Sequence, residues 1–183
     1  MNDIAERYER VSAQFTARVR AVPATAWDNP SPCEGWTARD IVRHLTDWIP
    51  AFFGSHGVVF PAVPSVDDDP VGAWETVQMT IAGALADPAI AAQPVATPFS
   101  TQSLAETVDM IVTGELFTHG WDLARATGQS EILDPEQLRR MIASLGAIPE
   151  EAMRAEGMFG PRIDVPADAD DQTRFLAYMG RRA

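Results

Sequence analysis

The sequence predicts an all-α protein whose core is a bundle of four long helices. Four segments place apolar residues three and four positions apart, which is the spacing of one buried helix face. Helix start and stop signals flank them, and no segment sustains the alternation typical of strands. With 183 residues, 46% of them apolar, the chain is long enough for a single domain over residues 1–183. The expected helices are near 3–21, 38–53, 71–86 and 104–127.

Composition excludes several classes of protein. The formal net charge is −12, and so acidic a surface repels phosphate backbones, which argues against nucleic acid as a partner. No apolar run is long enough to span a membrane, and the charged N-terminus lacks the apolar core of a signal peptide. The only cysteine, Cys33, leaves no partner for an internal disulfide. We therefore expect a cytoplasmic protein.

The first two helices have clear limits. Pro23 ends the first, and the prolines of the following loop keep residues 27–36 out of a helix. Thr37, followed three residues later by Asp40, predicts an N-cap for the second, although Pro50 is expected to kink it. The apolar faces that we expect are Ile4, Tyr8, Val11, Phe15 and Val19 in the first helix and Ile41, Leu45, Trp48 and Phe52 in the second.

A proline- and aspartate-rich loop at 54–70 precedes the third helix. Residues 87–102 contain three prolines and predict a long irregular connection, which in a small domain is often functional, for example as a lid. Ser103 and Glu106 form the pattern of a capping box that opens the longest helix, and Gly128 suits its C-terminal end.

Shorter elements follow toward the C-terminus. Asp134 and Pro135 predict an N-cap and first residue of a helix that Gly146 ends. We also expect short helices at 149–156 and 170–179, with extended chain over 157–168. Together with the four long segments, these short C-terminal helices complete an all-α bundle.

A candidate metal site lies in the longest helix. Glu115 and His119 stand four residues apart, so their side chains share a face and one ion can contact both. His44, on the second helix, is the best third ligand. Two histidines and one carboxylate, with a position left open, are typical of catalytic zinc sites and of non-haem iron sites. The alternative is an ordinary Glu–His hydrogen bond on a helix and a satisfied boundary histidine.

Each of these histidines has an aspartate three residues further on. Asp47 and Asp122 are therefore candidates to accept the free ring N–H of His44 and His119 and to orient them. Alternatively, the aspartates face solvent or pair with Arg43 and Arg125. Two other residues are notable: we expect His56 to be exposed and Cys33 to be a small buried hydrophobe, although its thiol precedes the His44 helix and can approach a metal or substrate.

Two stretches resemble a known family. Ser31-Pro32-Cys33-Glu34-Gly35-Trp36-Thr37 with Asp40-Ile41-Val42-Arg43-His44-Leu45, and His119-Gly120-Trp121-Asp122-Leu123-Ala124-Arg125-Ala126-Thr127-Gly128, look like actinobacterial proteins related to the metal-binding N-terminal domain of mycothiol-dependent maleylpyruvate isomerase. This group belongs to the DinB/YfiT-like superfamily of four-helix bundles, and the tail from Phe159 to Arg181 resembles its single-domain members.

The resemblance implies a divalent metal held by His44, Glu115 and His119, usually zinc, with nickel or another transition metal as the alternative. It also implies a low-molecular-weight thiol, such as mycothiol or bacillithiol, as cosubstrate. The isomerase carries a second, C-terminal domain that contributes to its active site and has no counterpart in these residues. We therefore do not expect maleylpyruvate isomerisation itself.

The leading hypothesis is a thiol-dependent, metal-assisted transferase or isomerase. A metal-bound thiol ionises near neutral pH and adds to a small electrophilic molecule. Arg43 or Arg125 would hold a substrate carboxylate, and residues 87–102 would contact the substrate. A metal-binding bundle without catalysis (a sensor, store or interaction protein) is the second hypothesis, and a metal-free bundle the third. The sequence leaves open whether the protein is a monomer or a homodimer.

Overall fold

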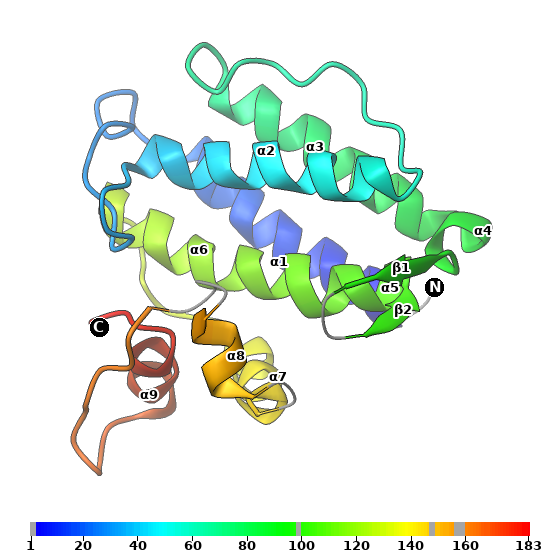
Figure 1. Cartoon of the computed structure of the whole chain (residues 1–183). Helices are drawn as coiled ribbons and strands as arrows, with labels where there is room; N and C mark the ends of the chain where they lie inside the picture. The colour runs from blue at the N-terminus through cyan, green and yellow to red at the C-terminus, as the bar shows by residue number, and fades with distance from the viewer. Residues whose placement is uncertain (1–2, 98–99, 147–148, 156–159) are drawn as a thin grey trace. The chain divides into compact units, whose positions relative to one another are not determined.

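The computed structural model describes residues 3–97, 100–146, 149–155 and 160–183 (Figure 1). These residues are mostly helical, with one small two-stranded sheet, so the all-α prediction is confirmed. None of the helices in these ranges is long and apolar enough to cross a membrane. The chain divides into two compact units, Met1–Glu131 and Ile132–Ala183. That the whole chain is a single domain stays a prediction.

The first unit contains the predicted four-helix bundle. Helix α1 packs against α3 and α6, and α2 packs against the same two helices, so the four form a closed ring of neighbours (Figure 1). Their ends lie close to the predicted ones, except that α6 begins later than the predicted helix 104–127. The bounds are α1 Asp3–Arg20, α2 Ala38–Ser55, α3 Pro70–Ala86 and α6 Thr113–Thr127.

Local signals in the sequence determine where these helices begin and end. The Thr37 hydroxyl accepts the Asp40 N–H, and the Asp40 carboxylate accepts the Thr37 N–H at 2.9 Å, forming the predicted capping box of α2. A cap of this kind stabilises a helix by about 1 kcal/mol. Helix α2 continues through Pro50. Helix α6 ends at Gly128, whose φ of +70° is accessible to glycine without strain.

The apolar faces of the helices form the core. Within α1 the side chains of Tyr8, Val11, Phe15 and Val19 are buried as predicted, whereas Ile4 is only half-buried. The α2 stripe differs in its second half: Ile49 and Phe53 are buried there, and the predicted Trp48 and Phe52 are not fully buried. The difference matters because it leaves Trp48 beside the metal-ligand candidates.

Residues 87–102 are more regular than predicted. They contain a short helix, α4 (Pro88–Ala91), and two antiparallel strands, β1 (Pro94–Ala96) and β2 (Thr101–Ser103). Val95 is fully buried and pairs with Gln102. The prediction of an irregular connection is therefore wrong for this segment, apart from 98–99, which lie outside the described residues. The buried Val95 side chain therefore holds the 87–102 connection in place.

The predicted helix 104–127 is interrupted by one turn of π-helix. Helix α5 (Leu104–Thr107) leads into the π turn η1 (Val108–Val112), and α6 follows. The Thr113 N–H and hydroxyl both donate to the Val108 carbonyl, five residues back. A π turn is wider than an α turn and is frequent at functional sites. It shifts the phase of α6, which carries both Glu115 and His119.

A buried arginine fastens this π turn to α1. The Arg7 side chain is 4% exposed and forms an ion pair with Asp109 in the π turn and another, at 2.6 Å, with Asp3. A buried guanidinium requires such partners, because a charge without them is strongly disfavoured away from water. The ion pair therefore fixes the segment that precedes the candidate ligands.

The second unit contains α7 (Pro135–Ser144), α8 (Glu150–Ala155) and α9 (Asp171–Tyr178), of which α7 and α9 pack together. Asp134 caps α7 as predicted, accepting the Gln137 N–H at 2.8 Å. The predicted helix 149–156 is α8, with Glu156 outside the described residues. Of the segment predicted to be extended, 157–159 lie outside the described residues, and 160–168 form neither helix nor strand.

Candidate metal centre

The structure brings the three predicted ligands together on neighbouring helices. His44 projects from α2, and Glu115 and His119 project from α6. One ligand atom from each residue lies within 4.8 Å of the other two. Nε2 of His44 is 3.3 Å from Oε2 of Glu115, and the two histidine rings meet edge to face with centroids 5.3 Å apart.

The donor set and its spacing fit a divalent metal. Zinc binds histidine nitrogen and carboxylate oxygen at about 2.0–2.2 Å, so two ligands of a tetrahedral ion lie about 3.3–3.5 Å apart. The His44–Glu115 separation of 3.3 Å is already within this range. The His119 ligand atom lies within 4.8 Å of the other two. Three protein ligands would leave one position of a tetrahedral ion for an exogenous ligand.

Exposure differs across the site. The side chains of His44 and Glu115 are 31% and 33% exposed, whereas that of His119 is 11% exposed. One side of the ligand set is therefore accessible from solvent, and the other is embedded in the bundle. An accessible side is what a substrate or cosubstrate requires to approach the ligands.

Asp122 lies against His119 on the buried side of its ring. Its carboxylate is fully buried and accepts a hydrogen bond from Nδ1 of His119 at 3.0 Å. With the proton on Nδ1, the lone pair is on Nε2, the nitrogen available to a metal. The contact has the geometry of the predicted orienting role, whereas the role itself stays a prediction.

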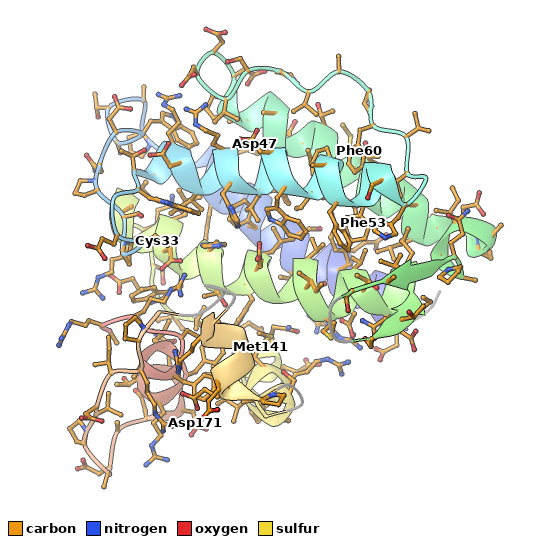
Figure 2. The ribbon with its side chains drawn as sticks, viewed as in Figure 1. Cys33, Asp47, Phe53, Phe60, Met141 and Asp171 are labelled. Atoms are coloured by element: carbon orange, nitrogen blue, oxygen red, sulfur yellow. The ribbon has the colours of Figure 1, made fainter. Side chains whose placement is uncertain are left out.

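Cys33 meets the same carboxylate. Its thiol donates to Oδ2 of Asp122 at 3.4 Å, and the residue is half-buried rather than fully buried. Figure 2 shows Cys33 in the loop before α2, at one end of the bundle. The sequence contains no local signal for this contact, because 89 residues separate the two partners.

Two tryptophans line the site, and sequence reasoning assigned neither of them to it. The Trp36 ring lies 5.0 Å from the His44 ring and stacks on that of His119 at 6.0 Å. The Trp48 ring is 6.3 Å from that of His44. Trp48 lies one helical turn after His44, a spacing that the sequence does contain. Together the two indole rings therefore lie beside both histidines.

Asp47 is not brought to His44. It is exposed, and among the described residues it makes no hydrogen bond to the His44 ring. Figure 2 places Asp47 on the edge of α2 away from α6. Of the two predicted orienting aspartates, the structure therefore places only Asp122 against its histidine.

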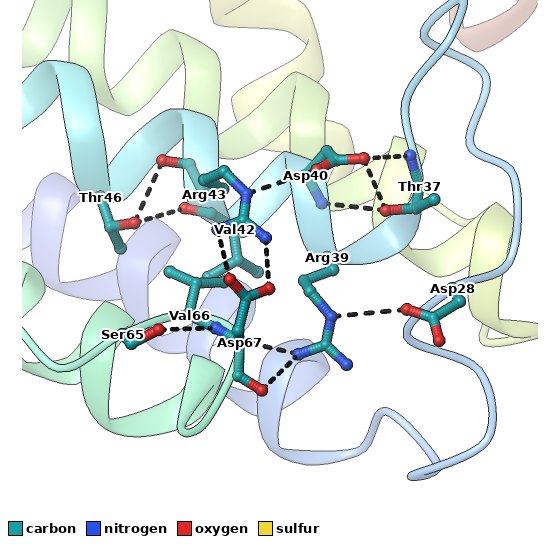
Figure 3. Close-up of polar contacts among 10 residues, drawn as sticks. All are labelled: Asp28, Thr37, Arg39, Asp40, Val42, Arg43, Thr46, Ser65, Val66 and Asp67. Carbon is teal, nitrogen blue, oxygen red and sulfur yellow. Dashed lines mark hydrogen bonds and ion pairs between the residues drawn. The ribbon is translucent and has the colours of Figure 1, made fainter.

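Both candidate substrate-binding arginines have carboxylate partners. Arg43 bonds to Asp67 at 2.7 Å and to Asp40 at 3.4 Å (Figure 3). The hydrogen bonds that Arg43 donates to Asp67 raise the pKa of Arg43. Hydrogen bonds donated by Thr37, followed by that from Arg43, lower the pKa of Asp40. These partners are not the predicted aspartates at 47 and 122.

Arg125 is also held in place. It pairs with Glu131 at 3.1 Å, and its guanidinium lies over the Trp121 ring, 5.1 Å from the centroid. A substrate carboxylate would have to displace or join these contacts, and the substrate-binding role of both arginines stays a prediction.

His56 was expected to be exposed and is half-buried instead. Nδ1 of His56 lies 2.9 Å from the Phe52 carbonyl oxygen, and the two rings are in contact with centroids 4.7 Å apart. These contacts with Phe52, at the end of α2, explain why the His56 side chain is half-buried. His56 belongs to neither group of potential metal ligands in the described residues.

A cavity of about 460 Å³ lies elsewhere in the first unit. None of the three candidate ligands is among the residues that line it. Its walls come mainly from small side chains of α1, α3 and α4, and include Ala5, Tyr8, Ala82, Leu85 and Ala91.

Comparisons with known proteins agree with the resemblance seen in the sequence. Two proteins of Mycobacterium tuberculosis, the uncharacterized protein Rv0738 of strain H37Rv and the uncharacterized protein MT0763 of strain CDC 1551, are each 28% identical to the chain over 183 residues. The alignments cover 95% of this chain and 95% of each relative. No solved structure matches significantly. Residues 8–74, which include His44, match the family described as the mycothiol maleylpyruvate isomerase N-terminal domain, and the resemblance to that family is thereby confirmed.

Proposed function

We propose that the protein is a metal-dependent enzyme that joins a low-molecular-weight thiol to a small electrophilic molecule, or isomerises that molecule by adding and removing the thiol. The observation that carries this proposal is the partly exposed ligand set of His44, Glu115 and His119. A metal store would be expected to enclose its ion, whereas this set is accessible on one side.

The three ligands would hold a divalent ion, zinc in the first instance. Such an ion, when bound, lowers the pKa of a coordinated thiol and supplies a thiolate near neutral pH. Asp122 retains the Nδ1 proton of His119 and so presents Nε2 toward the site. Trp36 and Trp48 shield the histidines from water, and their faces suit an apolar part of a substrate.

The matched family suggests mycothiol as the thiol, because its description names that compound. Arg43 is the candidate to hold a substrate carboxylate, since it lies one residue from His44 and is 36% exposed even while paired with Asp67. A net charge of −12 argues for small-molecule partners rather than nucleic acid. A cytoplasmic location agrees with the use of a reduced thiol.

Metal analysis followed by a thiol-consumption assay tests the proposal. The purified protein is expected to contain zinc or another transition metal and to accelerate the loss of mycothiol with at least one member of a panel of small electrophiles. Removal of the metal with a chelator should abolish the acceleration, and re-addition should restore it.

Variants separate catalysis from metal binding alone. His44→Ala is expected to lose the metal of the His44, Glu115 and His119 site and with it the thiol-dependent reaction, whereas His56→Ala, just past the end of the same helix and outside the ligand group, should keep both. A protein that holds its metal tightly and consumes no thiol with any electrophile would favour the non-catalytic alternative.

A further inference from the structure

A second group of potential ligands lies on the buried side of His119. It consists of Cys33 Sγ, a carboxylate oxygen of Asp122 and a ring nitrogen of His119, all within 4.8 Å of one another. Oδ2 of Asp122 is 3.4 Å from Sγ of Cys33 and 3.0 Å from Nδ1 of His119. Neither His44 nor Glu115 belongs to this group.

These separations suit a tetrahedral ion. With bonds of about 2.3 Å to sulfur and 2.0–2.2 Å to nitrogen and oxygen, ligand atoms lie about 3.3–3.7 Å apart. The 3.4 Å separation is in this range, and the 3.0 Å separation is a few tenths of an ångström short. Sulfur, nitrogen and oxygen together favour a borderline-soft or soft divalent ion such as zinc, cobalt or cadmium.

The surroundings of this group also favour an ion. The Asp122 side chain is fully buried, and a cation offsets the cost of burying a carboxylate. Cys33 is presented by a braced turn: its N–H bonds to the Ser31 hydroxyl, its carbonyl accepts the Trp36 N–H at 3.0 Å, and Gly35 turns the chain with a φ of +78°. The backbone that carries the Cys33 side chain is therefore braced before any ion arrives.

His119 links the two groups through different nitrogens. A neutral imidazole has one lone pair, so it ligates through Nε2 when Nδ1 carries the proton, and through Nδ1 when Nε2 carries it. The nitrogen facing Asp122 is Nδ1. The two groups therefore compete for the same ring, and each tautomer serves one of them.

We propose that Cys33, Asp122 and His119 form a second, thiolate-containing site for a thiophilic divalent ion, occupied as an alternative to the site of His44, Glu115 and His119. Binding there releases the Cys33 thiol proton to solvent and moves the His119 proton from Nδ1 to Nε2. The ion then lies on the buried side of the ring, away from the partly exposed His44 and Glu115. This inference does not depend on the proposed reaction.

Cobalt(II) and cadmium(II) absorption tests the second site, because thiolate ligation gives near-ultraviolet charge-transfer bands that nitrogen and oxygen ligands do not. Reduced protein, freed of all added thiol under anaerobic conditions, is titrated with each ion. Glu115→Gln, which weakens the first site and keeps the side-chain volume, should bind about one cobalt ion per chain with a thiolate band. Glu115→Gln combined with Cys33→Ser should lose the band.

Absence of the band in folded Glu115→Gln, with either ion, overturns the proposal. If Glu115→Gln fails to fold, as judged by circular dichroism in chelator, the wild-type protein with cadmium decides: its band must appear and must vanish in Cys33→Ser. Equal spectra for those two proteins overturn the proposal as well.

The single Cys33→Ser variant separates this inference from the proposed function. If Cys33→Ser binds zinc and consumes thiol, the first site and its reaction stand, whatever the cadmium result. If the wild-type protein shows the thiolate band and Cys33→Ser binds no ion at all, the second site stands and the proposed function fails.

Discussion

The buried carboxylate of Asp122 lies 3.0 Å from Nδ1 of His119, on the side of the ring opposite Nε2. We predict that this contact orients the His119 ring and favours the tautomer with its proton on Nδ1. Asp122→Asn retains the size of the side chain and removes its charge. We expect it to lower zinc affinity about 10- to 100-fold, which is usual for loss of such a partner. Competition with a chromophoric chelator measures the change.

Asp47→Asn is the matched control, because Asp47 also stands three residues after a histidine but is exposed and makes no hydrogen bond to it in the described structure. Its zinc affinity should remain within about twofold of wild type. An equal loss in both variants would mean that overall charge, rather than the contact with His119, sets the affinity.

Metal binding should stabilise the bundle, because Glu115 and His119 share α6 while His44 belongs to α2, so the full site forms only when the two helices pack. A zinc concentration about 1,000 times Kd would add about 4 kcal/mol to the free energy of unfolding. His44→Ala should lose the part of that increment that comes from binding at the site of His44, Glu115 and His119. Thermal unfolding of wild type and variant, each in zinc and in chelator, measures this loss. The two proteins should differ in Tm in zinc and have similar Tm values in chelator.

Glu115→Ala and His119→Ala should behave as His44→Ala does. His56→Ala should keep the zinc-dependent rise in Tm, because His56 bonds to the Phe52 backbone instead of joining the ligands. Wild-type zinc affinity in the His44 variant would disprove the three-residue site.

The buried ion pair of Arg7 with Asp109 should contribute more to stability than a surface pair. Arg7→Ala leaves the Asp109 carboxylate, 18% exposed, without this partner, and we expect a loss of about 3 kcal/mol in the free energy of unfolding. The control is Arg20→Ala, because Arg20 is 64% exposed and pairs with Glu75 at 2.7 Å. We expect it to lower the free energy of unfolding by less than about 1 kcal/mol. Urea denaturation of both variants in chelator tests the difference, and similar losses would contradict it.

Acid should weaken the start of α2. Hydrogen bonds from Thr37, and then Arg43, lower the pKa of Asp40 below its ordinary value of 3.8. A carboxyl whose pKa is lower in the folded state stabilises the fold above its unfolded pKa. That stabilisation is lost as pH falls below about 4, through the folded value. Asp40→Asn should therefore show a shallower loss of stability below about pH 4, measured by urea denaturation at several pH values. An unchanged acid slope would contradict this assignment.

Local signals allowed much of the fold to be predicted. The caps at Thr37, Ser103 and Asp134 and the stop at Gly128 act through neighbouring backbone groups, so they are readable from a few residues. The π turn was not predicted, since nothing in Val108–Val112 departs from an ordinary helical pattern. Nor was the pairing of β1 with β2, whose strands are three residues each.

The candidate site shows the same division. The four-residue spacing of Glu115 and His119 is local, so the sequence alone predicts that one ion can contact both side chains. The contact of Cys33 with Asp122 and the pairing of Arg43 with Asp67 join segments far apart in the chain, so spacing alone carries no sign of them. Asp47 and Asp122 have equivalent positions after a histidine, yet only burial within the bundle distinguishes them.

The π turn Val108–Val112 contains one residue more than an α-helical turn would, in the helix that leads to the ligands. In an uninterrupted α-helix of the same length, Glu115 would lie within about 20° of the direction of Leu104 and Val108, both fully buried. The extra residue rotates the carboxylate away from that hydrophobic direction. Removing one residue from Val108–Val112 would therefore let the turn close as an ordinary α-helix while the faces on both sides keep their directions. If the turn instead closed as an α-helix without losing a residue, the ligands would rotate about the helix axis although no ligand had changed.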